Sequence, residues 1–116
     1  MARIKRGQVW VANLDPGFES EIRKKRPVLI ISNDTINAYW PKVIAVPITT
    51  KVFYPGVEKV SIGKEAGVKV DSELLATEIR SIDKKRLVKK AGKITKEKLF
   101  EVEAALRAVL GIEEIN

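Results

Sequence analysis

The sequence contains no cysteine and no histidine. Without cysteine, the protein has no disulfide bond, no thiol nucleophile and no thiolate site for zinc or an iron–sulfur cluster. Without histidine, it lacks the usual imidazole base and the most frequent metal ligand. Any chemistry must therefore use carboxylates, hydroxyls, lysine, arginine or the backbone.

Long apolar segments and glycine-rich phosphate loops are also missing. The longest apolar runs, residues 28–31 and 43–48, are much shorter than a membrane-spanning helix. The basic N-terminus leads into a strand-like segment without the apolar region of a signal peptide, and the glycines are dispersed singly. No tight group of carboxylates suggests a metal site. We therefore expect a cytoplasmic protein with no membrane partner, no cofactor and no metal.

Positive charge is abundant. The 22 lysines and arginines outnumber the 15 acidic residues, which gives a formal net charge of +7. A basic protein favours polyanionic partners such as nucleic acid, although a lysine-rich solubilising surface explains the same composition. At 116 residues, we expect residues 1–116 to form a single domain.

Hydrophobic patterning predicts a mostly β protein. We expect strands at residues 8–14, 27–32, 43–50, 57–62, 74–79 and 87–94. The continuous apolar run at residues 27–32 is typical of a strand buried on both faces. Pro47 interrupts the third of these segments, which indicates an edge position or a bulge.

Helical signals are fewer. Asn33 and Asp34 resemble a cap for a short turn at residues 35–39, and residues 81–83 are expected to cap another. Residues 95–111 have apolar side chains at helical spacing, with Thr95 as a plausible N-cap and Gly111 as a natural end. Because the strands come first and the helix last, we predict an α+β fold, either an amphipathic helix on a mostly antiparallel sheet or a small closed barrel.

Two local features carry most of the polar chemistry. Glu19, Ser20 and Glu21 precede the cationic cluster at residues 23–26, at the start of a buried strand. Thr49, Thr50 and Lys51 end another strand. Each feature alone is explained by solvated ion pairs or by backbone capping. Together, cations, hydroxyls and a carboxylate suit a phosphodiester substrate.

Four ordered motifs resemble the MazF/PemK (Kid-like) toxin family. Residues 6–16 (RGQVWVANLDP) are similar to its RGDVYxADLxP opening, and residues 19–30 (ESEIRKKRPVLI) to its GSEx-to-RPVLI segment. Residues 43–50 parallel the strand that ends in a Pro/Ala-x-Thr motif, and residues 79–84 (IRSIDK) parallel QIRTIDK. The likeness covers nearly the whole chain.

The resemblance implies a small SH3-like barrel, shared with CcdB toxins, with a C-terminal amphipathic helix. It also implies a homodimer that acts as a metal-independent, sequence-specific endoribonuclease on single-stranded RNA. Attack by the ribose 2′-hydroxyl would leave a 2′,3′-cyclic phosphate and a 5′-hydroxyl. A MazE-like antitoxin with a disordered acidic tail would inhibit it, and operator DNA would be a partner only through that antitoxin.

Carried over residue by residue, the family's catalytic arginine and threonine fall on Arg26 and Thr49, and its GSE glutamate falls on Glu21. Since arginine is a poor proton acceptor, we favour Glu21, or a water that it orients, as the base. The expected RNA-binding residues are Ser20, Arg23, Lys24, Thr50, Lys51, Phe53, Glu78 and Arg80.

The sequence departs from the family at two places. Glu78 replaces the usual glutamine, so it keeps an acceptor and loses a donor. Residues 75–77 lack the Arg-x-Asp pair that Kid-type members use, which favours a MazF-type site. Two alternatives remain: a gyrase-directed poison like CcdB, which would not need Arg26 and Thr49, and a non-catalytic nucleic-acid-binding barrel.

Overall fold

The computed structural model describes residues 3–14, 25–50 and 59–112. These residues form strands, two α-helices and short 3-10 turns. The strands are β1 (Gln8–Asn13), β2 (Lys25–Ile30), β3 (Lys42–Thr49), β4 (Lys59–Ile62), β5 (Ser72–Leu75), β6 (Arg80–Asp83) and β7 (Leu87–Lys93). The helices are α1 (Asp34–Tyr39) and α2 (Lys96–Leu110), and the 3-10 turns are η1 (Lys64–Ala66), η2 (Ala76–Glu78) and η3 (Lys84–Arg86).

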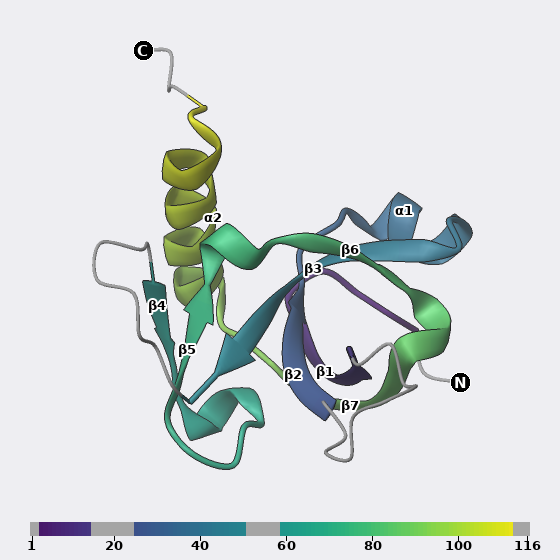
Figure 1. Ribbon diagram of the computed structural model, residues 1–116, viewed down its shortest axis with the longest axis horizontal. Coiled ribbons are helices and arrows are strands. Elements are labelled where there is room, and N and C mark those ends of the chain that lie inside the picture. Colours follow the sequence, from purple (N-terminus) through teal and green to yellow (C-terminus); the bar gives the residue numbers. More distant parts are fainter. Residues whose placement is uncertain (1–2, 15–24, 51–58, 113–116) are drawn as a thin grey trace.

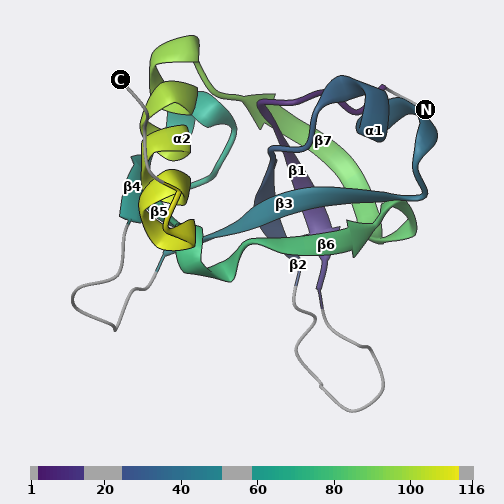
Figure 2. The same ribbon diagram turned by 90° about the horizontal axis from the view of Figure 1, so that it is seen from above.

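All of the strand pairings are antiparallel. The strand order is β4-β5-β3-β2-β1-β7, and β6 pairs with the first half of β3. The sheet curls strongly (Figure 1), and α2 lies beside β4 and β5 at one end of the molecule while α1 lies at the other (Figure 2). This antiparallel sheet with a C-terminal helix confirms the predicted fold class.

The central strands are buried on both faces. Leu29 packs into one core cluster, whereas its neighbours Val28 and Ile30 pack into a second cluster on the opposite face. The alternation follows from the strand period of two, and it confirms the prediction made from the apolar run. The first cluster also receives α2, through Val102 and Leu106.

Capping residues delimit both helices. The Thr95 side chain accepts a hydrogen bond from the Lys98 amide at 3.1 Å, and Gly111 ends α2 in the left-handed region at φ 71°. Asn33 caps α1 by accepting from the Ile36 amide at 2.9 Å. Local sequence therefore fixes the ends of both helices, as predicted.

Arg6 ties the N-terminal segment to three elements. Its Nε donates to the Ile31 carbonyl at 2.9 Å, its backbone amide donates to Asp34 Oδ1 at 2.7 Å, and its Nη2 lies 2.9 Å from Glu103 Oε2 on α2. The first motif of the chain thus has a structural role in holding α1, α2 and the end of β2 together.

The prediction of one strand over residues 74–79 is wrong. β5 ends at Leu75, η2 follows, and β6 begins at Arg80. β5 pairs with the end of β3 at Ile48, whereas β6 pairs with its beginning. The chain must turn between these two pairings, so Ser81 and Ile82 belong to β6. Of the residues expected to cap a turn, Asp83 does so, because its Oδ1 accepts from the Lys85 amide at 2.8 Å.

The prediction that Pro47 marks an edge or a bulge is also wrong, because β3 has partners on both sides. The Ile44 amide and carbonyl both bond toward the β2 side, so by alternation the Pro47 nitrogen faces away from β2. On that side, pairing with β6 stops at Ala45 and pairing with β5 starts at Ile48. Pro47 lies in this gap, where its missing N–H interrupts no registered pair.

Within the described residues, neither helix has the length and apolarity needed to cross a lipid bilayer. The cytoplasmic location stays a prediction.

Candidate functional site

Five of the predicted site residues lie in the described parts of the chain: Arg26, Thr49, Thr50, Glu78 and Arg80. The others lie outside the described residues, namely Ser20, Glu21, Arg23, Lys24, Lys51 and Phe53.

Arg26 is the second residue of β2, where its side chain is exposed. It pairs with Ala12 of β1, and the next pair along joins Asn13 and Lys25. The Arg86 guanidinium donates through Nη1 to the Asn13 carbonyl at 3.0 Å. Arg86, from η3, therefore holds the end of the strand against which Arg26 lies.

Thr49 is the last residue of β3 and is half-buried. The β2–β3 register pairs Ile30 with Ala45 and Val28 with Pro47. The printed pairing ends at Val28 and Pro47, and Arg26 and Thr49 each lie two residues beyond that pair, at the same end of the two strands. Because successive side chains of a strand alternate between its faces, both residues share the face of the Val28–Pro47 pair. The two residues expected to be catalytic thus end adjoining strands on the same face.

Glu73 lies on the other side of Thr49. The β3–β5 register pairs Thr49 with Glu73, and the β4–β5 register pairs Glu73 with Ser61. The row Thr49–Glu73–Ser61 therefore crosses three strands on one face of the sheet. Sequence reasoning missed Glu73. The alternation of side chains along β5 turns Glu73 to the face opposite the buried Ser72 and Leu74, but it does not reveal which strand lies beside it.

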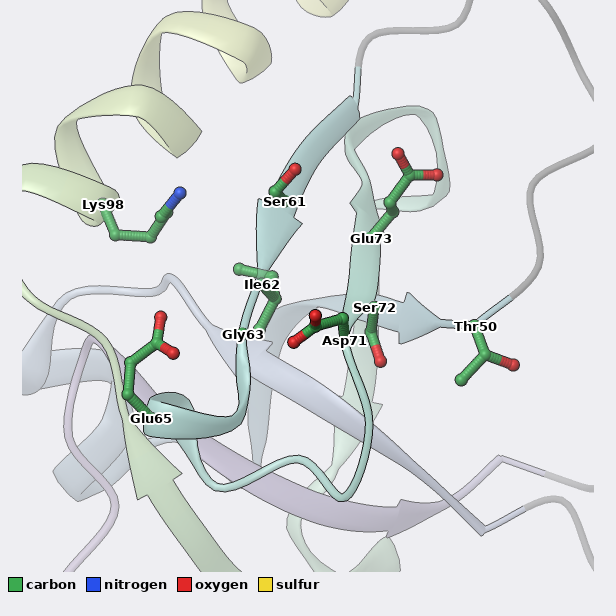
Figure 3. Close-up of a pocket in the computed structure, with 9 residues that line it drawn as sticks. All are labelled: Thr50, Ser61, Ile62, Gly63, Glu65, Asp71, Ser72, Glu73 and Lys98. Carbon is green, nitrogen blue, oxygen red and sulfur yellow. The ribbon is translucent and has the colours of Figure 1, made fainter.

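A cavity of about 500 Å³ lies beside this row. Figure 3 shows Thr50 at one end, Ser61, Asp71, Ser72 and Glu73 along β4 and β5, and Lys98 with Glu65 beyond β4. The lining is polar and contains both carboxylates and hydroxyls. The cavity adjoins the strand end that carries Thr49.

Arg80 and Glu78 are both exposed, and they lie further from the arginine–threonine pair. Arg80 pairs with Ala45, four residues before Thr49 on β3, which corresponds to about 13 Å along the strand. Arg80 shares a face with Thr49 because the separation is an even number of residues. A ligand that contacts both must therefore be extended.

An arginine and a threonine at adjoining strand ends can bind a phosphate group. The guanidinium carries a permanent charge and several donors, and the hydroxyl can donate to a non-bridging oxygen. Among the residues that the structure describes, no three carboxylates come together to form a cation site. The described part of the site is thus suited to an anionic, extended ligand.

Comparison with known families gives a match over residues 5–110 to the family described as PemK-like, MazF-like toxin of type II toxin-antitoxin system. A curated relative, "Endoribonuclease MazF" from Staphylococcus epidermidis, is 38% identical over 120 residues, which is 97% of this chain and 96% of the relative.

Solved structures share the fold. One is an endoribonuclease in complex with its cognate antitoxin from Mycobacterial species, with a TM-score of 0.78, 27% identity, and coverage of 99% of this chain and 100% of that one. Another is a MazE–MazF structure from Deinococcus radiodurans, with a TM-score of 0.80, 25% identity, and coverage of 97% and 100%. The likeness therefore extends over the whole domain.

Proposed function

The chain belongs to the PemK-like, MazF-like toxin family of type II toxin–antitoxin systems and is an endoribonuclease, and we propose that it cleaves single-stranded RNA at specific sequences without a metal ion. The observation that supports this proposal is that Arg26 and Thr49 lie at the same end of the paired strands β2 and β3, each two residues beyond the Val28–Pro47 pair. The absence of histidine and cysteine from the sequence supports chemistry based on a guanidinium and a hydroxyl.

The proposed reaction is an internal transfer. The ribose 2′-oxygen forms a bond to phosphorus while the bond from phosphorus to the 5′-oxygen breaks, which leaves a 2′,3′-cyclic phosphate and a 5′-hydroxyl. The 2′-hydroxyl proton passes to a base, for which Glu21 or a water that it orients is our candidate. The leaving 5′-oxygen takes up a proton from the solvent, and the base later returns its own proton to the solvent, so that protons balance.

Arg26 has the role of charge stabilisation in this scheme. Negative charge builds up on the phosphoryl oxygens in the transition state, and a fixed guanidinium stabilises that charge more than it stabilises the ground state. Thr49 donates a hydrogen bond to a non-bridging oxygen. Because both residues lie at the ends of strands, the sheet sets the positions of their backbones.

We propose two protein partners, a MazE-like antitoxin with an acidic tail and a second copy of the chain. The mycobacterial relative was solved with its cognate antitoxin. Exposed apolar side chains on the described surface, among them Tyr39, Trp40 and Phe100, supply surface that a partner can bury. A basic toxin and an acidic tail are complementary in charge.

An end-mapping assay tests the proposed reaction. Purified protein is incubated with a long single-stranded RNA in the presence of EDTA, and the ends of the products are sequenced and their chemistry determined. Discrete cuts with cyclic-phosphate ends support the proposal. Cleavage that requires added metal, intact RNA with trapped gyrase, or a gel shift without cuts would each contradict it.

A further inference from the structure

We propose that Glu73 recognises a guanine base next to the phosphate that is cleaved, within the cavity of Figure 3. This inference rests on the proposed function, because it assigns a base preference to the same RNA site. Three features of Glu73 support it: its pairing, its lack of a hydrogen-bond or ion-pair partner among the described residues, and the chemistry of a carboxylate toward the four bases.

The pairing puts Glu73 beside Thr49, one of the two residues proposed to hold the reacting phosphate. Thr49 and Glu73 are directly opposed in the β3–β5 register, a relation that sets their Cβ atoms about 5 Å apart. A phosphate held by Arg26 and Thr49 would thus have the Glu73 side chain on the side away from Arg26. The base of a flanking nucleotide can then enter the cavity over β4 and β5.

The Glu73 carboxylate is available for a ligand. It is half-buried, and among the described residues it takes part in no ion pair and no hydrogen bond. Among the described residues that line the cavity, the cation is Lys98, whose ammonium lies 3.4 Å from Glu101 Oε2 on the same helix. Figure 3 shows Lys98 on the far side of β4 from Glu73. Glu73 is therefore not neutralised by Lys98.

A carboxylate distinguishes guanine from the other bases. Two carboxylate oxygens accept two parallel hydrogen bonds, and guanine presents N1–H and the N2 amino group side by side. Adenine and cytosine present one amino group beside a ring nitrogen acceptor, which repels a carboxylate. Uracil presents one N–H between two carbonyls. In single-stranded RNA these edges are free to be read.

Neighbouring hydroxyls can complete the recognition. Ser61 is directly opposed to Glu73 on β4, and Thr50 follows Thr49 at the cavity end. A hydroxyl both donates and accepts, so it can bond to the guanine O6 carbonyl that a carboxylate cannot satisfy. The sequence preceding β5 contributes Asp71 to the same lining.

The first test measures cleavage. After the cuts of the parent protein are mapped, RNA oligonucleotides that differ only in the base flanking the cut are compared for the parent, Glu73→Gln, Glu73→Ala and the control Glu97→Gln on α2. We expect the parent and the control to favour guanine by about tenfold or more, which is typical of one bidentate base contact. Both Glu73 variants should cut all four substrates at similar rates.

A second test is independent of cleavage. Short RNAs that carry 2′-O-methyl groups at every position, with either guanine or uracil at the flanking position, are titrated against each variant by fluorescence anisotropy. The parent should bind the guanine RNA more tightly, and the Glu73 variants should lose that difference. Circular dichroism checks that each variant is folded.

Two outcomes would overturn the inference: a parent protein that shows no guanine preference, or Glu73 variants that retain the full preference. If the protein binds guanine RNA selectively through Glu73 but cleaves no RNA, the proposed function fails while this assignment stands. If it cleaves RNA and the Glu73 variants keep the base preference of the parent, this assignment fails while the proposed function stands.

Discussion

Gly67 and Gly92 approach each other so closely that neither position has room for a side chain. A Cβ atom on Gly67 would collide with the Ala91 carbonyl, and one on Gly92 would collide with the Ala66 carbonyl. Gly67 follows η1, and Gly92 lies in β7. Their contact brings β7, at one end of the strand order, against the connection that leads from β4 at the other end.

Gly92→Ala should destabilise the fold by about 2 kcal/mol, since overpacking a well-packed contact typically has that effect. The obstructing atoms belong to the backbone and cannot move aside as a flexible side chain would. Urea unfolding followed by circular dichroism measures the change.

Gly111→Ala is the matched control for this prediction. Gly111 has a positive φ of 71° but no atom near the added methyl group, so only the left-handed backbone is strained. We expect a loss of about 1 kcal/mol. Equal losses at the two positions would show that close packing between Gly67 and Gly92 is unimportant.

Arg26→Ala should abolish RNA cleavage while leaving folding and dimerisation intact. Arg26 is exposed, so its removal empties no core position, but the transition-state charge loses its fixed cation. We expect a fall in the cleavage rate of at least about 100-fold, as for the loss of other charge-stabilising donors. A variant that cuts at the parent rate would end this assignment.

Thr49→Val should also slow cleavage, by about tenfold or more, because valine keeps the shape of threonine and removes the donor. A time course on one defined RNA, with the melting temperature as the folding check, measures the effect. Thr35→Val, at an exposed position of α1, is the control and should cleave at the parent rate.

Asp34 should make stability depend on pH in the acid range. The Arg6 backbone amide, followed by the Asn37 side chain, holds the pKa of Asp34 below its usual value. A lowered folded-state pKa contributes stability above the unfolded-state pKa, and this stability is lost as the pH falls through the folded-state pKa. Asp34→Asn should therefore be less stable than the parent at pH 7, and this difference should shrink as the pH falls through the lowered folded-state pKa of Asp34.

Urea titrations at several pH values measure this difference. The effect should be small, because Asp34 is exposed and solvent screens its charge. A gap between parent and variant that stays constant from pH 7 to pH 2.5 would contradict the linkage.

Arg80→Ala should reduce the salt dependence of RNA binding. If Arg80 contacts a phosphate, its loss lowers the slope of log K against log salt by about 0.7, the value per phosphate contact on a single strand. The slope is measured from binding to a 2′-O-methylated RNA at KCl concentrations between roughly 50 and 300 mM. Lys96→Ala, at the start of α2, is the control and should leave the slope unchanged.

Several parts of this protein follow from local sequence. Thr95 and Gly111 delimit α2 because a capping hydroxyl and a left-handed glycine act within one turn of the chain. The apolar run around Leu29 identifies a strand buried on both faces, since no polar side chain interrupts it. The motif likeness identifies Arg26 and Thr49 as candidate site residues from the sequence alone.

Tertiary structure decided the features that depend on the pairing of strands far apart in the sequence. Pro47 stands in a central strand because β6 and β5 leave a gap between their pairings with β3. Glu73 faces Thr49 because β5 meets β3 at one register, and a shift by one residue would turn its carboxylate to the other face. Capping and periodicity act over a few neighbouring residues, whereas strand register joins residues far apart in the chain, so only the folded sheet could bring that carboxylate to the site.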